Sequence, residues 1–307
     1  MINLHFSKPG LQTLVVDQGR TGYQSWGIPV GGAVDQSSAS LANWLVGNPL
    51  TSPVLEITLM GPSIEIQGEG QIAITGADLS PKINEQEIPI FETINVTSGM
   101  KLSFGAPKKG CRAYIAVRGL WQLKPWFSSY SALACDSTGI TKSSVIKKNS
   151  TLSIDAQSNI SPKRIAKNQR PGYSNLLTVS VLPGPEFDSF SKDVLQQFLK
   201  QSFKLSPQSN RMGCRLNPEL EISAGSEMIS SGVIPGTIQI TSSGQPIILL
   251  ADAQTTGGYP RIANVISTDI DALGQMKPGD EVNFELVDLS DAQIAIAEKQ
   301  KAFNFLS

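Results

Sequence analysis

Hydrophobic residues in the first half of the chain form short runs, several of which alternate with polar residues and are separated by Gly, Pro, Asn or Ser. A period of two, broken by turn residues every few positions, is typical of strands in an all-β sandwich or barrel. The pattern predicts strands at 12–16, 55–59, 63–67, 71–75, 82–84, 93–96, 101–104 and 113–117. The clearest helical spacing is at 37–46, and Asn48-Pro49 marks the end of that helix.

The second half repeats this outline after a polar and basic stretch at 155–174, which we interpret as a linker or crossing segment. Strands are predicted at 176–182, 203–205, 219–222, 237–240, 247–250 and 281–286. Helices are predicted at 191–201, 263–267 continuing through 268–273, and 290–303. We therefore expect a mostly β protein with a few short helices and two domains, 1–165 and 166–307.

Composition narrows the possible functions. The 307 residues are 40% hydrophobic, enough for two cores, and the formal net charge of −1 with no long basic run argues against nucleic-acid binding. The densest basic cluster, 142–148 with three lysines, is interpreted as a solvated turn. Three widely separated cysteines, Cys111, Cys135 and Cys214, fit a reducing compartment. Without a signal peptide or membrane span, a cytoplasmic location is expected.

The segment 252–261, Asp-Ala-Gln-Thr-Thr-Gly-Gly-Tyr-Pro-Arg, carries the densest candidate chemistry, directly after the apolar run 247–251. Gly257 and Gly258 allow the backbone N–H groups to approach a ligand oxygen. The hydroxyls of Thr255 and Thr256 are suited to a developing oxyanion, and Gln254 and Tyr259 to orienting a small amide. The alternative is a Gly-Gly hairpin turn whose polar residues only satisfy the loop backbone.

Charged residues add further candidates. Asp252 follows a strand expected to be buried, so it could act as a base or cap a turn. Arg211, in the Ser/Asn/Gly-rich loop 206–215, suits a bidentate hold on a carboxylate or phosphate, or an interdomain salt bridge. Asp35 precedes the predicted helix and fits a helix-start acid. Glu56 interrupts an apolar strand; if buried, it needs a partner such as Arg20 or Arg118.

The residue types present argue against several common catalytic, metal-binding and nucleotide-binding motifs. The chain has one histidine, His5, so neither a Ser-His-Asp system nor a histidine-based metal site is supported, and no metal is expected. There is no Gly-x-x-x-x-Gly-Lys-Ser/Thr motif and no strand-linked Gly-x-Gly-x-x-Gly motif. ATP binding is therefore assigned to another protein.

Three segments together, 19–35, 206–215 and 252–261, resemble the KipA-like family, also called allophanate hydrolase subunit 2 or the C subunit of 5-oxoprolinase. Shorter matches are Gly76-Ala-Asp78, Leu182-Pro-Gly-Pro185 and Lys277-Pro-Gly-Asp280. The resemblance implies two cyclophilin-like β-barrels. It also implies a complex with a KipI-like partner of the B type and a further partner of the A type, which opens 5-oxoproline to glutamate at the expense of ATP.

The same resemblance implies two alternatives. A related module belongs to the carboxyltransferase region of urea amidolyase, where carboxybiotin carboxylates urea or a similar amide. This chain has no biotin-attachment motif, so biotin would ride on another protein. The third hypothesis is a non-enzymatic antagonist that binds a KipI-like inhibitor of a histidine kinase.

For the oxoprolinase hypothesis, Arg211 is expected to hold a carboxylate or phosphate, Thr255 and Thr256 to stabilise negative charge, and Asp252 to direct a proton or water. Gln254, Gly257, Gly258, Tyr259, Asp35 and Glu56 are the expected substrate-binding residues. The isolated chain, which binds no cofactor by itself, is expected to be inactive. The chain departs from the family pattern at 128–131 and 137–144, where two expected arginines are missing, and at Gly119-Leu120.

Overall fold

The computed structural model describes residues 1–133, 139–222 and 228–306. Packing divides the chain into two compact units. Unit 1 comprises Met1–Arg20 and Gly31–Tyr173, and unit 2 comprises Thr21–Val30 and Ser174–Ser307. The second unit therefore includes a short segment from near the N-terminus, and residues 166–173, which the sequence assigned to the second domain, pack in unit 1.

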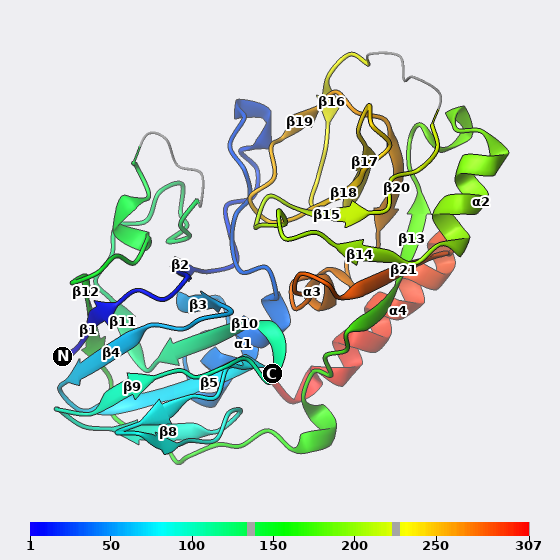
Figure 1. Ribbon diagram of the computed structural model, residues 1–307. Helices are drawn as coiled ribbons and strands as arrows, with labels where there is room; N and C mark the ends of the chain where they lie inside the picture. Colours follow the sequence, from blue (N-terminus) through cyan, green and yellow to red (C-terminus); the bar gives the residue numbers. More distant parts are fainter. Residues whose placement is uncertain (134–138, 223–227, 307) are drawn as a thin grey trace. The chain divides into compact units, whose positions relative to one another are not determined.

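Unit 1 consists of two β-sheets and one long helix (Figure 1). The seven-stranded sheet has the order β11-β12-β1-β4-β9-β6-β7, and the five-stranded sheet has the order β2-β3-β10-β5-β8. The strands of the first sheet are β1 (Ile2–Lys8), β4 (Ser63–Gln67), β6 (Lys82–Ile83), β7 (Gln86–Glu87), β9 (Lys101–Ser103), β11 (Gly119–Trp121) and β12 (Thr151–Ala156). Those of the second are β2 (Gln12–Val16), β3 (Val54–Thr58), β5 (Gly70–Asp78), β8 (Thr93–Val96) and β10 (Lys109–Val117).

Burial patterns explain how these sheets pack. β1 buries Ile2, Leu4 and Phe6 and leaves the residues between them half-exposed, as expected when one face of a sheet meets the core. β5 and β10 are buried at nearly every position, because their second face is covered by α1 (Gln36–Leu45). The predicted helix at 37–46 is confirmed within one residue.

Unit 2 is a closed barrel of seven strands in the order β13-β20-β17-β18-β15-β14-β21, and the parallel pairing of β13 with β21 closes it. The barrel strands are β13 (Leu176–Pro183), β14 (Phe203–Leu205), β15 (Gly213–Asn217), β17 (Thr237–Ile240), β18 (Pro246–Leu249), β20 (Arg261–Val265) and β21 (Glu281–Leu286). A separate ladder joins β16 (Ser231–Gly232) to β19 (Thr256–Gly257). The mostly β fold is confirmed.

Helices complete unit 2. They are α2 (Lys192–Lys200), α3 (Ile270–Leu273) and α4 (Leu289–Ala302), together with the 3₁₀ turns η1 (Gln24–Trp26), η4 (Phe187–Ser189) and η5 (Asn304–Leu306). The rings of Phe198 on α2 and Phe284 on β21 stack with centroids 4.4 Å apart, so α2 packs directly on the barrel. Unit 1 contains η2 (Lys142–Ser144) and η3 (Lys167–Gln169).

Two element predictions are wrong. Residues 263–267 belong to strand β20 and its end, because both neighbours, β13 and β17, supply antiparallel backbone partners to this segment. Residues 219–222 are irregular rather than a strand: the Ile222 N–H bonds to the nearby Leu220 carbonyl at 2.9 Å, and Leu220 to Gly244. The strands β1, β7, β11, β12, β15, β16 and β19 were not predicted.

The stretch 155–174, interpreted as a linker, is largely a packed arm of unit 1. The Ile165 side chain is 1% exposed, and its N–H bonds to the Phe91 carbonyl at 3.1 Å. The Thr93 N–H bonds to the Lys163 carbonyl at 2.9 Å. These contacts place the division of the chain after Tyr173. In the described ranges, no helix has the length and apolar character needed to cross a membrane.

Candidate functional site

The loop after β18 begins with a buried ion pair. Arg211 precedes β15 and Asp252 follows β18, and because these strands are antiparallel neighbours the two residues meet at one end of the barrel. The Arg211 guanidinium donates from Nε to Asp252 Oδ2 at 2.9 Å and from Nη2 to Oδ1 at 2.8 Å. The Asp252 N–H also bonds to the Arg211 carbonyl at 3.0 Å. The structure thus brings the two predicted catalytic charges together, each bound to the other.

Burial makes this pair a rigid support. The side chains of Arg211 and Asp252 are 0% and 2% exposed. A charge removed from water is stable only when it is paired and hydrogen-bonded, as a bidentate guanidinium–carboxylate contact provides. The pair fixes the point where the loop 252–259 leaves the barrel.

Further along the loop, Thr255 and Thr256 line a pocket of about 560 Å³ in unit 2. Its other lining residues come from η1 and from β16 with the residues after it: Gln24, Ser25, Gly27, Gly232, Val233 and Ile234. The ladder that pairs Gly232 with Thr256, and the 3.0 Å bond from the Val233 N–H to the Thr255 carbonyl, hold two walls together. The described lining residues carry no charge: the polar side chains of Gln24, Ser25, Thr255 and Thr256 stand beside an apolar side at Val233 and Ile234.

The polar groups of this pocket are available to a ligand. In the described ranges, the hydroxyls of Ser25, Thr255 and Thr256 have no hydrogen-bond partner. The Gln24 Oε1 accepts from the Gly22 N–H at 2.9 Å, which fixes the amide and leaves its NH₂ group as a donor. The pocket therefore offers several neutral hydrogen-bonding groups, the type of lining that suits a small amide.

Close packing around the loop explains why glycines occupy positions 257 and 258. A Cβ on Gly257 would lie 2.4 Å from Nε2 of Gln239, a side chain that is 2% exposed. Gln239 donates from Nε2 to the Tyr259 carbonyl at 3.2 Å, and its Oε1 lies 3.5 Å from Nε2 of Gln254. The buried Gln239 side chain thus contacts the loop at both Tyr259 and Gln254. Gln254 and Tyr259 are exposed, and a Cβ on Gly258 would lie 3.3 Å from the Met228 carbonyl oxygen.

A second ion pair supports the pocket. Arg261 donates from Nε and Nη2 to Glu186 at 2.8 and 2.6 Å, and from Nη1 to the carbonyl of Gly232, a lining residue, at 2.9 Å. These hydrogen bonds from Arg261 lower the pKa of the Glu186 carboxyl. Glu186, Gln239, Gln24 and Ser25 were not predicted as site residues. Arg261 ends the 252–261 run, and Gln24 and Ser25 lie in the segment 19–35 that carries the family resemblance.

Asp35 and Glu56, the two other predicted residues, lie in unit 1, whereas the groups above lie in unit 2. Asp35 caps α1: its Oδ1 accepts from the Ser38 N–H at 2.8 Å, as the helix-start interpretation predicts. Glu56 is 1% exposed, and its Oε2 accepts from the Tyr114 hydroxyl at 2.8 Å and the Val34 N–H at 2.9 Å.

Tyr114 links these two acids. Its oxygen accepts from the Asp35 N–H at 2.9 Å while its hydrogen goes to Glu56. Burial, and next the charges of Glu56 and Asp35, raise the pKa of the Tyr114 phenol well above its ordinary value. Buried Glu56 has a basic partner, as expected: Arg112, whose Nε lies 3.6 Å from Glu56 Oε1. This network anchors the start of α1 to β3 and β10.

The described residues contain no group of three or more His, Cys, Asp or Glu placed to hold a metal ion. Of the three cysteines, Cys111 and Cys214 are buried, and Cys135 lies outside the described residues. The altered segment 137–144 is likewise described only from residue 139 onward.

Comparison with known proteins identifies the family. Residues 26–286 match the family described as carboxyltransferase domain, subdomain A and B. The 5-oxoprolinase C subunit of Escherichia coli is 34% identical over 308 residues, which cover 99% of this chain and 97% of that protein. The urea amidolyase of Saccharomyces cerevisiae is 32% identical over 304 residues, which cover 92% of this chain and only 16% of that protein.

The fold is shared as well. The crystal structure of the K. lactis urea amidolyase superposes with a TM-score of 0.91 at 29% identity, over 99% of this chain and 20% of that chain. Together with the sequence matches, this shows that the chain belongs to the carboxyltransferase-domain family that includes the C subunit of 5-oxoprolinase and the corresponding region of urea amidolyases.

Proposed function

We propose that this chain is the C-type subunit of a cytoplasmic, ATP-dependent 5-oxoprolinase, in which it works with two partners, a KipI-like one of the B type and one of the A type. The observation that carries the proposal is the match to the 5-oxoprolinase C subunit of E. coli, which extends over nearly the whole length of both chains. In the urea amidolyases the similar stretch is a small part of a much longer protein.

The unit 2 pocket supports this choice of substrate class. A cyclic amide presents one carbonyl acceptor and one N–H donor, and the hydroxyls of Ser25, Thr255 and Thr256 can serve both. In this proposal Thr255 and Thr256 stabilise the negative charge that develops on the amide oxygen. Gln24 orients the ring through its amide.

In this proposal Arg211 and Asp252 do not contact the substrate but position the loop that does. Because Arg211 and Asp252 already satisfy each other, we assign them to holding the loop 252–259 in place; the Gln239 contact with Gly257 keeps that loop close to the barrel. Tyr259 and Gln254 are exposed on the same loop, and Gly258 is half-buried. ATP use is assigned to the partner proteins, so the isolated chain should not turn over 5-oxoproline.

The test is ADP release by a reconstitution of this chain with its B-type and A-type partners. Release should depend on 5-oxoproline and should disappear when this chain is omitted. The variant Thr256→Val keeps shape but removes the pocket hydroxyl, and we expect turnover to fall about 10- to 100-fold. The matched control is Thr178→Val, an exposed threonine on β13 outside the pocket, which should turn over as the wild type does. Wild-type turnover by Thr256→Val would remove Thr256 from the site.

The second candidate function is a carboxyltransferase acting on urea or a similar amide with carboxybiotin supplied by another protein. The family match and the close superposition on the K. lactis urea amidolyase favour it. Adding urea and a biotinylated carrier to the same assay separates the two: activity with these alone would select the carboxyltransferase. A stable complex that responds to neither substrate would instead select the non-enzymatic antagonist of a KipI-like protein.

A further inference from the structure

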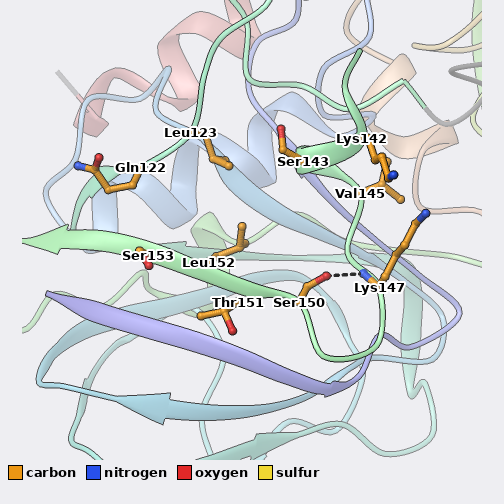
Figure 2. A pocket seen from close by; sticks show the side chains of 10 residues that line it. All are labelled: Gln122, Leu123, Lys142, Ser143, Val145, Lys147, Ser150, Thr151, Leu152 and Ser153. Carbon is orange, nitrogen blue, oxygen red and sulfur yellow. Dashed lines mark hydrogen bonds between the residues drawn. The ribbon is translucent and has the colours of Figure 1, made fainter. Parts of the chain in front are cut away.

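A second pocket, of about 590 Å³, lies in unit 1 and is not used by the proposed function. It is built from the residues after β11, the η2 turn and the start of β12. Figure 2 shows its ten lining side chains: Gln122, Leu123, Lys142, Ser143, Val145, Lys147, Ser150, Thr151, Leu152 and Ser153. Among the described lining residues there are two cations and no carboxylate, whereas those of the unit 2 pocket are neutral.

The two cations have no counter-charge among the residues that the structure describes. Neither Lys142 nor Lys147 makes an ion pair with any residue in the described ranges, whereas Lys277 and Lys299 are each 2.8 Å or less from an aspartate. Other exposed lysines are also unpaired, but Lys142 and Lys147 line the same concave surface. Two like charges that share a pocket repel each other, and an anion between them removes that cost.

A hydroxyl is fixed beside these cations. The Ser150 Oγ accepts from the Lys147 N–H at 2.9 Å, and the Ser150 N–H bonds to the Lys147 carbonyl at 3.0 Å (Figure 2). This turn holds the Ser150 oxygen in place and leaves its hydrogen to donate to a ligand. Ser153 is different, because its hydroxyl already donates to Asn3 Oδ1 at 2.7 Å.

The rest of the pocket is apolar. Leu152 is 4% exposed and belongs to the core of unit 1, and Leu123 packs against that core. In Figure 2 these two side chains lie between Gln122 and the lysines. The surface therefore combines a cationic, hydroxyl-bearing side with a hydrocarbon floor, the pattern of a site for a small amphipathic molecule.

We propose that this pocket binds a small organic anion, with its oxyanion head between the Lys142 and Lys147 ammonium groups and the Ser150 hydroxyl, and its carbon skeleton on Leu123, Val145 and Leu152. A phosphate and a carboxylate head share this chemistry. The size of the pocket fits a metabolite rather than a nucleic-acid chain, for which the chain's net charge of −1 is also unsuited.

The experiment is calorimetric titration of the whole chain with n-butyl phosphate, with pentanoate, with inorganic phosphate and with 1-butanol. We expect saturable 1:1 binding of n-butyl phosphate or pentanoate, whichever head the site prefers, and weaker binding as ionic strength rises. Inorganic phosphate and 1-butanol, each lacking one half of the ligand, should bind at least about tenfold more weakly, a difference of about 1.4 kcal/mol.

Paired variants locate the site. Lys142→Gln/Lys147→Gln should weaken binding of the preferred anion at least about tenfold. The control Lys124→Gln/Lys148→Gln removes the same charge from nearby exposed lysines that do not line the pocket, and should bind as the wild type does. All of these positions are exposed, so folding should be unaffected, as thermal unfolding will show.

Three results would overturn the proposal: no saturable binding of either organic anion, equal weakening in both double variants, or inorganic phosphate binding as tightly as the organic anions. Because the readout is binding to the isolated chain, it is independent of 5-oxoproline turnover. A failed oxoprolinase assay therefore leaves this result intact, and the reverse also holds.

Discussion

Arg211 and Asp252, 41 residues apart in sequence, form a two-point ion pair in which both side chains are almost completely excluded from water. Both were selected from the sequence as catalytic groups. In the proposed function they support the loop 252–259, because each charged group is bound by the other where that loop begins. The consequence for stability can be measured directly.

Breaking this pair on one side should be costly. Arg211→Met leaves the Asp252 carboxylate buried without its cation, and we expect the free energy of unfolding to fall by about 3–5 kcal/mol. The double variant Arg211→Met/Asp252→Leu should recover much of that loss, since no buried charge remains. Urea unfolding followed by fluorescence measures both. As a control, Lys204→Gln breaks the exposed Lys204–Glu281 pair and should cost about 0.5 kcal/mol or less. A loss below about 1 kcal/mol for Arg211→Met would contradict the buried-pair description.

The contact between Gly257 and Gln239 predicts a compensating pair of substitutions. Gly257→Ala places a methyl group 2.4 Å from the Gln239 amide, so we expect a loss of about 1–3 kcal/mol and displacement of the loop. Gly257→Ala/Gln239→Ala opens the space again and should recover part of this stability. Thermal unfolding checks both variants, with Gly172→Ala, whose added methyl group meets nothing within 4 Å, as the neutral control. If the second substitution makes the loss larger, the steric explanation is wrong.

The Glu186–Arg261 pair predicts a pH dependence. The pKa of Glu186 is lowered in the folded state relative to its ordinary value of 4.5, so the folded protein holds fewer protons than the unfolded chain in the acid range. The pair therefore contributes stability above about pH 4.5, and that contribution is lost as pH falls through the lowered pKa. The wild type should be more stable than Glu186→Gln by about 1–2 kcal/mol at pH 7, and the difference should shrink below pH 4.5. Denaturant unfolding at a series of pH values measures it, and a difference that grows toward low pH would refute the sign.

Removing the Tyr114 hydroxyl is expected to lower the free energy of unfolding strongly. Tyr114→Phe leaves the Asp35 N–H without its acceptor and removes a donor from buried Glu56, at a cost of roughly 1–3 kcal/mol for each group. The phenol of Tyr130 makes no hydrogen bond within the described ranges, so Tyr130→Phe is the matched control and should be nearly neutral. Denaturant unfolding compares the two. Equal stability of both variants would mean that the network does not support α1.

Structural features that depend only on neighbouring residues could be predicted from the sequence. Asp35 is followed by an amphipathic run, and it caps α1 as expected, because capping needs only the residues of the first turn. Part of strand β20 was mistaken for a helix because the short segment 263–267 fits either structure, and the partners of β20, strands β13 and β17, decide between them. Those partners lie far along the chain, so no window around residue 263 contains them.

The candidate site shows the same limit. The loop 252–259 was found from its composition, and its glycines were interpreted as allowing the backbone to approach a ligand oxygen. The group that approaches Gly257, however, is Gln239, an ordinary polar residue in a strand. The wall formed by Gln24 and Ser25 comes from more than 200 residues away, and nothing in the sequence near Thr255 indicates that they meet.

The segment Thr21–Val30 makes the pocket of unit 2 depend on a part of the gene that lies within the coding region of unit 1. It is encoded within the first unit, yet it packs in the second and contributes Gln24, Ser25 and Gly27 to the pocket. A gene encoding only 174–307 would specify all the strands of the barrel and lack one side of its pocket. Recombination that exchanges either unit separately would therefore remove part of the pocket. We expect the coding regions of the two units to be kept together during evolution.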